Sequence, residues 1–116
     1  MPDSLTIPLD RLATLAVEHW RLATALAPTL QAPSAAPLRH ALRKIDDFLK
    51  SCDLETRCLD GQPYDPGLAA RVADTLDDPS LPPGVSPITE TLSPMILHKN
   101  TVLRPADVII SQRPRS

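Results

Sequence analysis

The sequence predicts an α+β protein, with a helical region over residues 1–52 and a small all-β domain over residues 53–116. Up to Cys52, apolar residues recur at the spacing of helices that pack through one face. After Cys52, short apolar runs alternate with Pro, Gly and Asp, as they do between short strands. Because a chain of 116 residues is too short for two independent cores, we expect the two parts to share one.

The first helix is expected to begin near Leu9 and to end before Pro28, after about five turns. We expect Asp10 to cap its first turn, because a carboxylate accepts hydrogen bonds from free amide groups there. Four leucines share one stripe of this helix: Leu12, Leu15, Leu22 and Leu26.

A second helix is expected after the proline-containing connector of residues 28–37. Its apolar residues follow one another at alternating spacings of four and three, which is the seam of a helix that packs against other helices. We predict that this seam pairs two copies of the chain, and an intramolecular helical hairpin is the alternative. Aromatic residues make up only 3% of the chain, which limits the core of a monomer and favours the homodimer. The predicted dimerisation residues are Leu38, Leu42, Ile45 and Leu49.

The second part is expected to contain a hairpin, with strands at residues 95–97 and 101–103 and a polar turn at residues 98–100. The β-branched run at residues 108–110 predicts a terminal strand, and residues 77–84 predict a loop. Residues 64–72 fit either a helix or a strand, and the pattern does not decide between them.

The net charge of -2 provides no broad basic face, so nucleic acid is not an expected partner. No segment has the charged and apolar regions of a signal peptide or the roughly eighteen apolar residues of a membrane span, so we expect a cytoplasmic protein without a membrane partner. Cys52 and Cys58 lie six residues apart, a spacing that fits neither a redox motif nor a zinc half-site, and we expect two reduced thiols.

An enzyme is not expected. A metal site would need His40 to converge with the two cysteines without a recognised spacing, and no nucleophile motif accompanies either thiol. The acidic pair Asp77 and Asp78 precedes a proline, which is typical of a solvated turn. We therefore predict no catalytic residue, no metal and no cofactor.

Five short motifs of the second part occur in an order that resembles one family. They are Gly61-Gln62-Pro63-Tyr64-Asp65-Pro66, the acidic pair Asp77-Asp78, Pro83-Gly84, the hairpin, and Val102-Leu103-Arg104-Pro105-Ala106-Asp107-Val108. Over residues 49–112 the chain is similar to GrpE, the nucleotide exchange factor of DnaK-type chaperones. The resemblance implies a helical dimer whose β-domains bind the ATPase domain of the chaperone, which would make the protein a cochaperone that promotes ADP release.

The resemblance also implies the residues that contact this partner: Tyr64, Pro66, Leu92 and Ile110, to which we add Met95 as a flexible apolar neighbour. The alternative for each is that it fills the small core. Two features differ from the family: Ala69 replaces a histidine, and Ser93-Pro94-Met95-Ile96 replaces the Gln-Lys-Gly-Tyr motif. These differences leave open a second interpretation, a scaffold or adaptor derived from GrpE that binds a chaperone-like complex without accelerating exchange.

Overall fold

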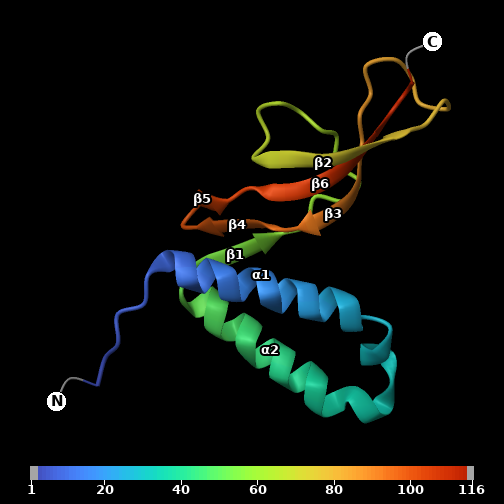
Figure 1. The fold of residues 1–116 in the computed structure, drawn as a ribbon. Helices are drawn as coiled ribbons and strands as arrows, with labels where there is room; N and C mark the ends of the chain where they lie inside the picture. The colour runs from blue at the N-terminus through green and yellow to red at the C-terminus, as the bar shows by residue number, and fades with distance from the viewer. Residues whose placement is uncertain (1–2, 115–116) are drawn as a thin grey trace.

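The computed structural model describes residues 3–114 and confirms the α+β fold, with two helices followed by six strands (Figure 1). Helix α1 spans Leu9–Leu26 and helix α2 spans Ala36–Ser51, joined by a connector that contains two short 3₁₀ helices. Helix α2 ends at Ser51 and strand β1 begins at Leu54, so helices give way to strands between these residues.

Helix α1 has the expected length, but the expected cap is wrong. The residue before its first turn is Pro8, which makes no side-chain capping bond, and Asp10 lies inside the first turn. The carboxylate of Asp10 instead accepts a hydrogen bond of 2.9 Å from Arg104, which also donates to Thr14 Oγ1 at 2.6 Å. The start of the helix is therefore tied to the β-domain by an arginine that is distant in sequence.

The buried side of α1 is made of small residues rather than the leucine stripe. Ala13, Ala16 and Val17 are buried, whereas Leu15 and Leu22 are 41% and 48% exposed. Small side chains allow the backbone of α1 to lie close to its neighbours, so this side rather than the bulkier leucines faces the core.

The strands form two sheets of three strands each, the first antiparallel and the second mixed. In the first sheet, β4 lies between β1 and β5 and is antiparallel to both. In the second, the terminal strand β6 lies at the centre, parallel to β2 and antiparallel to β3. The bounds are β1 Leu54–Arg57, β2 Ala70–Asp77, β3 Ile88–Ser93, β4 Met95–His98, β5 Thr101–Arg104 and β6 Ala106–Gln112. The structure thus confirms the hairpin and the terminal strand, and it resolves residues 64–72 as a turn followed by a strand.

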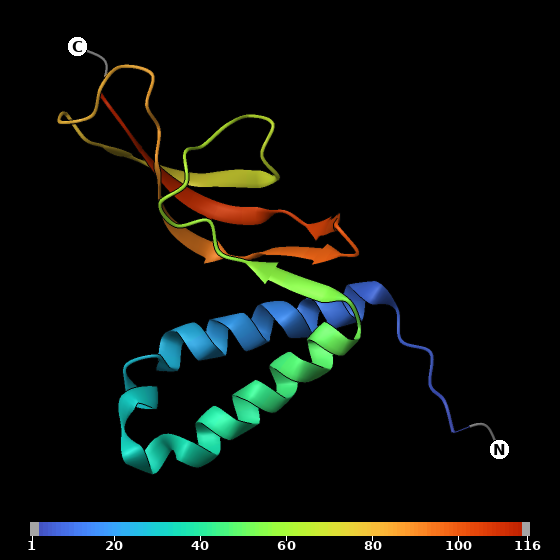
Figure 2. The ribbon, with the colours of Figure 1, turned by 180° about the vertical axis from the view of Figure 1, so that it is seen from behind.

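Two prolines connect the sheets. Pro94 alone separates β3 from β4, and Pro105 alone separates β5 from β6. Because proline has no N–H group and fixes its own φ angle, a ladder of hydrogen bonds is interrupted where it stands. The strands β3–β4 and β5–β6 therefore form one long antiparallel ribbon that passes from one sheet to the other at the two prolines (Figure 2).

The buried residues form two clusters rather than the one shared core that the sequence predicted. One buried cluster joins side chains of α1 and α2 to the first sheet, and it consists of Ala13, Ala16, Val17, Leu49, Leu54 and Ile96. A second cluster lies within the β-domain and contains Leu59, Ile88, Met95, Leu97, Ala106, Val108 and Ile110.

The molecule is long and thin, with extents of 67 × 36 × 17 Å and a radius of gyration of 17.4 Å. A compact chain of this length has a radius of gyration of about 13 Å. The accessible surface of 7912 Å² likewise exceeds the roughly 6,200 Å² expected for a folded monomer of this mass. Part of the excess comes from the extended residues 3–8, and the remainder reflects helices that are covered on few sides.

Candidate protein-interaction surfaces

The Gly-Gln-Pro segment of the β-domain protects the free edge of β3. The N–H of Gly61 donates to the carbonyl of Ile88 at 2.9 Å, the N–H of Ile88 donates to the carbonyl of Gln62 at 2.8 Å, and Pro63 forms an isolated bridge with Pro87. Gly61 adopts a φ of 82°, which L-residues with a side chain rarely adopt. The residues Gly61-Gln62-Pro63 of the predicted motif therefore have a structural role, which is to cover the edge of β3.

Three of the five predicted contact residues reach the surface. Pro66 is exposed, Leu92 is 41% exposed, and Tyr64 is half-buried against the β-domain core. Leu92 lies between Thr91 and Ser93, which are both buried, so its side chain points away from the core. These three residues can contact another protein without a rearrangement of the fold.

Met95 and Ile110 are not surface residues. They are 5% and 6% exposed and belong to the core cluster of the β-domain, so their assignment as contact residues is corrected to a packing role. Ile110 faces inward because it alternates with Ile109 along β6 and shares its side with Val108. The other residues of the altered hairpin motif, Ser93, Pro94 and Ile96, are buried as well, so the replacement there changes packing rather than exposed surface.

The predicted dimer seam of α2 divides into two halves. Leu42 and Leu49 are 7% and 3% exposed within the single chain, where α2 packs beside α1 and the first sheet, so these two residues follow the helical-hairpin alternative. Leu38 and Ile45 are only half-buried. They continue into a stripe at spacings of three and four that sequence reasoning missed, which we call the lateral stripe: Leu38, Ala41, Ile45 and Phe48.

Phe48 is the exposed aromatic residue of this stripe, with 47% of its surface accessible. Two features of the sequence could have identified Phe48 as part of this stripe. It is one of only three aromatic residues in the chain, and it follows Ile45 at a spacing of three. A phenylalanine exposed beside two partly buried aliphatic residues is typical of a surface that another chain covers.

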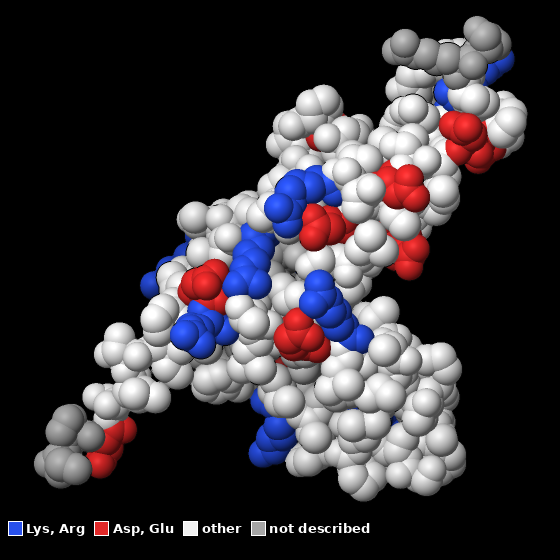
Figure 3. All heavy atoms as spheres, viewed as in Figure 1, with Lys and Arg blue, Asp and Glu red and all other residues white. Residues whose placement is uncertain are grey.

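The outer side of the second sheet carries charged residues. Figure 3 shows acidic and basic atoms over the region of β2, β6 and β3. Arg71 and Asp107 form an ion pair of 2.9 Å, while Asp74 and Glu90 lie opposite Ile109 on its two neighbouring strands. Any partner that binds this side meets an aliphatic residue between two carboxylates.

The acidic pair before Pro79 is divided between a strand and a turn. Asp77 is the last residue of β2, where the sequence predicted a loop, and Asp78 begins the turn. Asp78 accepts hydrogen bonds from Ser80 Oγ at 2.6 Å and from the N–H of Ser80 at 3.0 Å. These two bonds, the hydroxyl first, lower the pKa of the Asp78 carboxyl below its ordinary value. The group is solvated and serves the local turn.

The tip of the β4–β5 hairpin lies against the end of α2. Lys99 and Asn100 both have positive φ angles, 49° and 68°, and the N–H of Lys99 donates to the carbonyl of Asp53, whose own φ is 61°. The hairpin turn is therefore anchored, and the side chain of Lys99 is exposed at its tip.

The thiols do not assemble with His40. Cys52 and Cys58 are free, and His40 lies twelve residues before Cys52 on α2, which is about 18 Å along a helix. Across residues 3–114, no three His, Cys, Asp or Glu side chains converge as metal ligands. Within the same range, neither helix has the length and apolar character needed to traverse a bilayer.

No protein-family model matches the chain, and no curated protein matches it significantly.

Proposed function

We propose that the protein is a homodimeric cochaperone of the GrpE type, which acts in the cytoplasm and promotes ADP release from the ATPase domain of a DnaK-type chaperone. The observation that supports this proposal is the two-part architecture. A helical hairpin with an uncovered apolar stripe carries a β-domain in which the family-like motifs of residues 61–66 and 102–108 have defined structural roles.

The contact surface in this proposal consists of Pro66, Leu92 and the exposed part of Tyr64, with Lys99 at the hairpin tip. These residues lie on loops, on an edge strand and on an anchored turn of a small β-domain. A rigid framework that presents exposed apolar side chains suits binding by shape, because little order is lost on association.

Exchange by this surface requires no catalytic group. A factor that binds the open form of a nucleotide-binding cleft more tightly than the closed form weakens bound nucleotide by the same coupling free energy. Each tenfold weakening of ADP takes about 1.4 kcal/mol of differential binding, which a few apolar contacts provide.

The test measures release of a fluorescent ADP analogue from candidate DnaK-type ATPases. We expect faster release with the protein present, and about fivefold to thirtyfold weaker binding for Leu92→Ala because an apolar contact is lost. Val85→Ala is the matched control, since Val85 is 42% exposed on a loop of the same domain. Binding without faster release would refute exchange and favour the scaffold interpretation, and no binding to any such ATPase would refute both.

The dimer is proposed to form through the lateral stripe of α2. Part of the surface that the chain exposes beyond a compact monomer of its mass lies on the helices, and each partner in an interface of standard size buries about 800 Å². Burial of the stripe that contains Ala41 and Phe48 would cover the most exposed apolar part of α2.

Phe48→Glu tests this interface by light scattering coupled to size exclusion. A charge placed in a desolvated interface is strongly unfavourable, so we expect a monomer at concentrations where the parent chain is dimeric. Leu22→Glu is the control because Leu22 is exposed to the same extent on the other helix. A dimer that persists in Phe48→Glu but is lost in Leu22→Glu would place the interface on α1 instead.

A further inference from the structure

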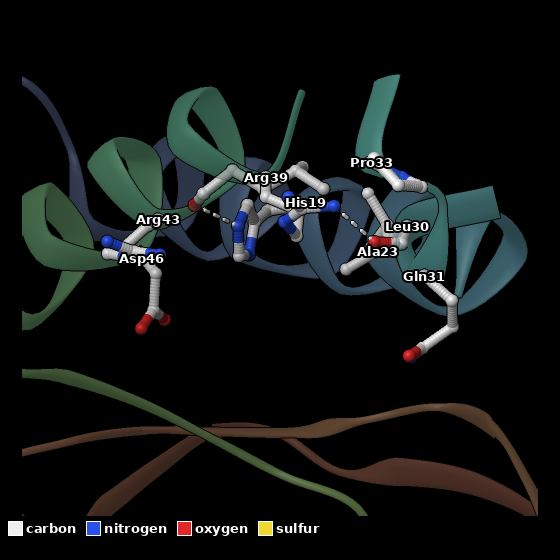
Figure 4. A pocket seen from close by; sticks show the side chains of 9 residues that line it. His19, Ala23, Leu30, Gln31, Pro33, Arg39, Arg43 and Asp46 are labelled. Atoms are coloured by element: carbon white, nitrogen blue, oxygen red, sulfur yellow. Dashed lines mark hydrogen bonds between the residues drawn. The ribbon is translucent and has the colours of Figure 1, made fainter. Parts of the chain in front are cut away.

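An open groove of about 760 Å³ lies between α1, α2 and the connector, and none of its lining residues belongs to the β-domain. In Figure 4, Arg43 and Asp46 lie at one end of the groove and Gln31 and Pro33 at the other, with His19 and Arg39 between them. Its size is within the range of small-molecule sites, and it combines apolar lining residues with a few polar groups placed along its length, as ligand sites do. The apolar lining residues are Ala23, Leu30, Pro33 and Leu42.

Arg39 is held in place by the connector. Its Nη1 donates to the carbonyls of Leu30 at 2.6 Å and Ala32 at 2.8 Å. Both N–H groups of Nη1 are thereby used, whereas Nε and Nη2 make no hydrogen bond to any residue of the described chain. That edge of a guanidinium presents two parallel donors, the geometry that binds a carboxylate in a bidentate manner.

The other charged groups of the groove leave it with an excess of positive charge. The carboxylate of Asp46 is paired with Lys50 at 2.8 Å, whereas Arg43 forms no ion pair within residues 3–114. His19 Nε2 lies 2.8 Å from the carbonyl of Leu42, and because a carbonyl only accepts, Nε2 is the donor. The groove of a chain with net charge -2 is therefore lined by two arginines whose donors are not fully used.

We infer that this groove binds a small amphipathic carboxylate, with the carboxylate on Arg39 and Arg43 and the hydrocarbon chain over the apolar floor. The charge complementarity selects an anion, and the pre-positioned guanidinium edge selects a planar, two-oxygen head group. The arginines follow one another at a spacing of four on α2, on roughly the opposite side from the lateral stripe, so the proposed dimer leaves the groove open. The inference does not depend on nucleotide exchange.

Octanoate is a suitable probe, with octanol and octylamine as ligands of the same chain length. In titrations of the full chain followed by amide NMR, we expect saturable shifts with octanoate at Ala23, Leu30 and Leu42, with a dissociation constant of about 1 mM or below. Equal binding of octanol would overturn the inference, because the carboxylate would then contribute nothing. Shifts elsewhere, or none that saturate, would overturn it as well.

Arg43→Gln removes one charge from the groove. The side chain of Arg43 forms no ion pair or hydrogen bond within residues 3–114, so the substitution should leave the fold intact. We expect about fivefold or weaker binding of octanoate, since a charge-assisted hydrogen bond in a partly solvated groove is lost. Lys44→Gln is the matched control, because Lys44 is an exposed neighbour that does not line the groove.

A second copy of the chain is the competing occupant of the groove. Diluting the protein in the absence of octanoate distinguishes the two cases. If the amide signals of the groove move on dilution and octanoate then binds more tightly, the groove is a contact between copies and the inference of a ligand site is overturned. Signals that stay constant over a hundredfold dilution support it.

Discussion

Replacement of Leu49 by alanine tests whether the helices and the β-domain unfold as one unit although they have separate buried clusters. Leu49 is 3% exposed in the cluster that joins α1, α2 and β4. Leu→Ala in a core costs about 2–5 kcal/mol, and more where neighbours cannot move into the cavity. The neighbours Ala13 and Ala16 are too small to fill it, so we expect a loss of about 3 kcal/mol.

The assay uses two probes that the sequence provides. Trp20 is the single tryptophan and lies on α1, and Tyr64 is the single tyrosine and packs against the β-domain core. At fixed protein concentration, the melting temperature of Leu49→Ala should fall by about 9–15 °C at both probes together. Leu22→Ala, at an exposed site, should change it little. If Trp20 melts early while Tyr64 keeps the parent transition, unfolding of the helices and the β-domain as one unit is refuted.

Three further changes test local interactions. Arg104→Gln should lower the free energy of unfolding by about 1 kcal/mol, because one partly exposed nitrogen bonds Asp10 and Thr14; a loss no greater than that of Arg21→Gln in urea unfolding would contradict this. Ser80→Ala should raise the pKa of Asp78 toward its ordinary value, followed by carboxyl NMR. Because the folded pKa is lowered, the contribution to stability is present above the ordinary pKa and is lost as pH falls through the lowered one. An Asn-Gly turn, made by Lys99→Asn with Asn100→Gly, should raise stability by about 0.5–1 kcal/mol, since both positions have positive φ; an unchanged melting temperature would refute this.

The helices and the hairpin were predictable because their signals are local. The apolar spacing of α2 and the polar turn between two short apolar runs are both patterns of neighbouring residues. The cap of α1 was not predictable, because the partner that binds Asp10 is Arg104, ninety-four residues away. A carboxylate near a helix start indicates a cap only when no distant cation competes for it.

The interaction residues were predicted less well than the fold. An apolar residue in a short strand faces the core or the solvent according to the register of the sheet, and a shift of one residue reverses the outcome. Ile110 and Leu92 show both results, the first buried and the second exposed. The groove residues Arg39 and His19 were missed because each bonds a backbone carbonyl of another element, and no sequence pattern marks such a contact.

The antiparallel ribbon of β3–β4 and β5–β6 can transmit force between the two sheets of the β-domain. Besides the segment of residues 58–69, the second sheet is joined to the first by two single-residue links, Pro94 and Pro105, so a force on the second sheet reaches the helices partly through these prolines. Their fixed φ angles restrict rotation at both links at once, so the second sheet should behave as a short lever with limited freedom to rotate. A partner that tilts this lever would press on α1 through Arg104 and Asp10.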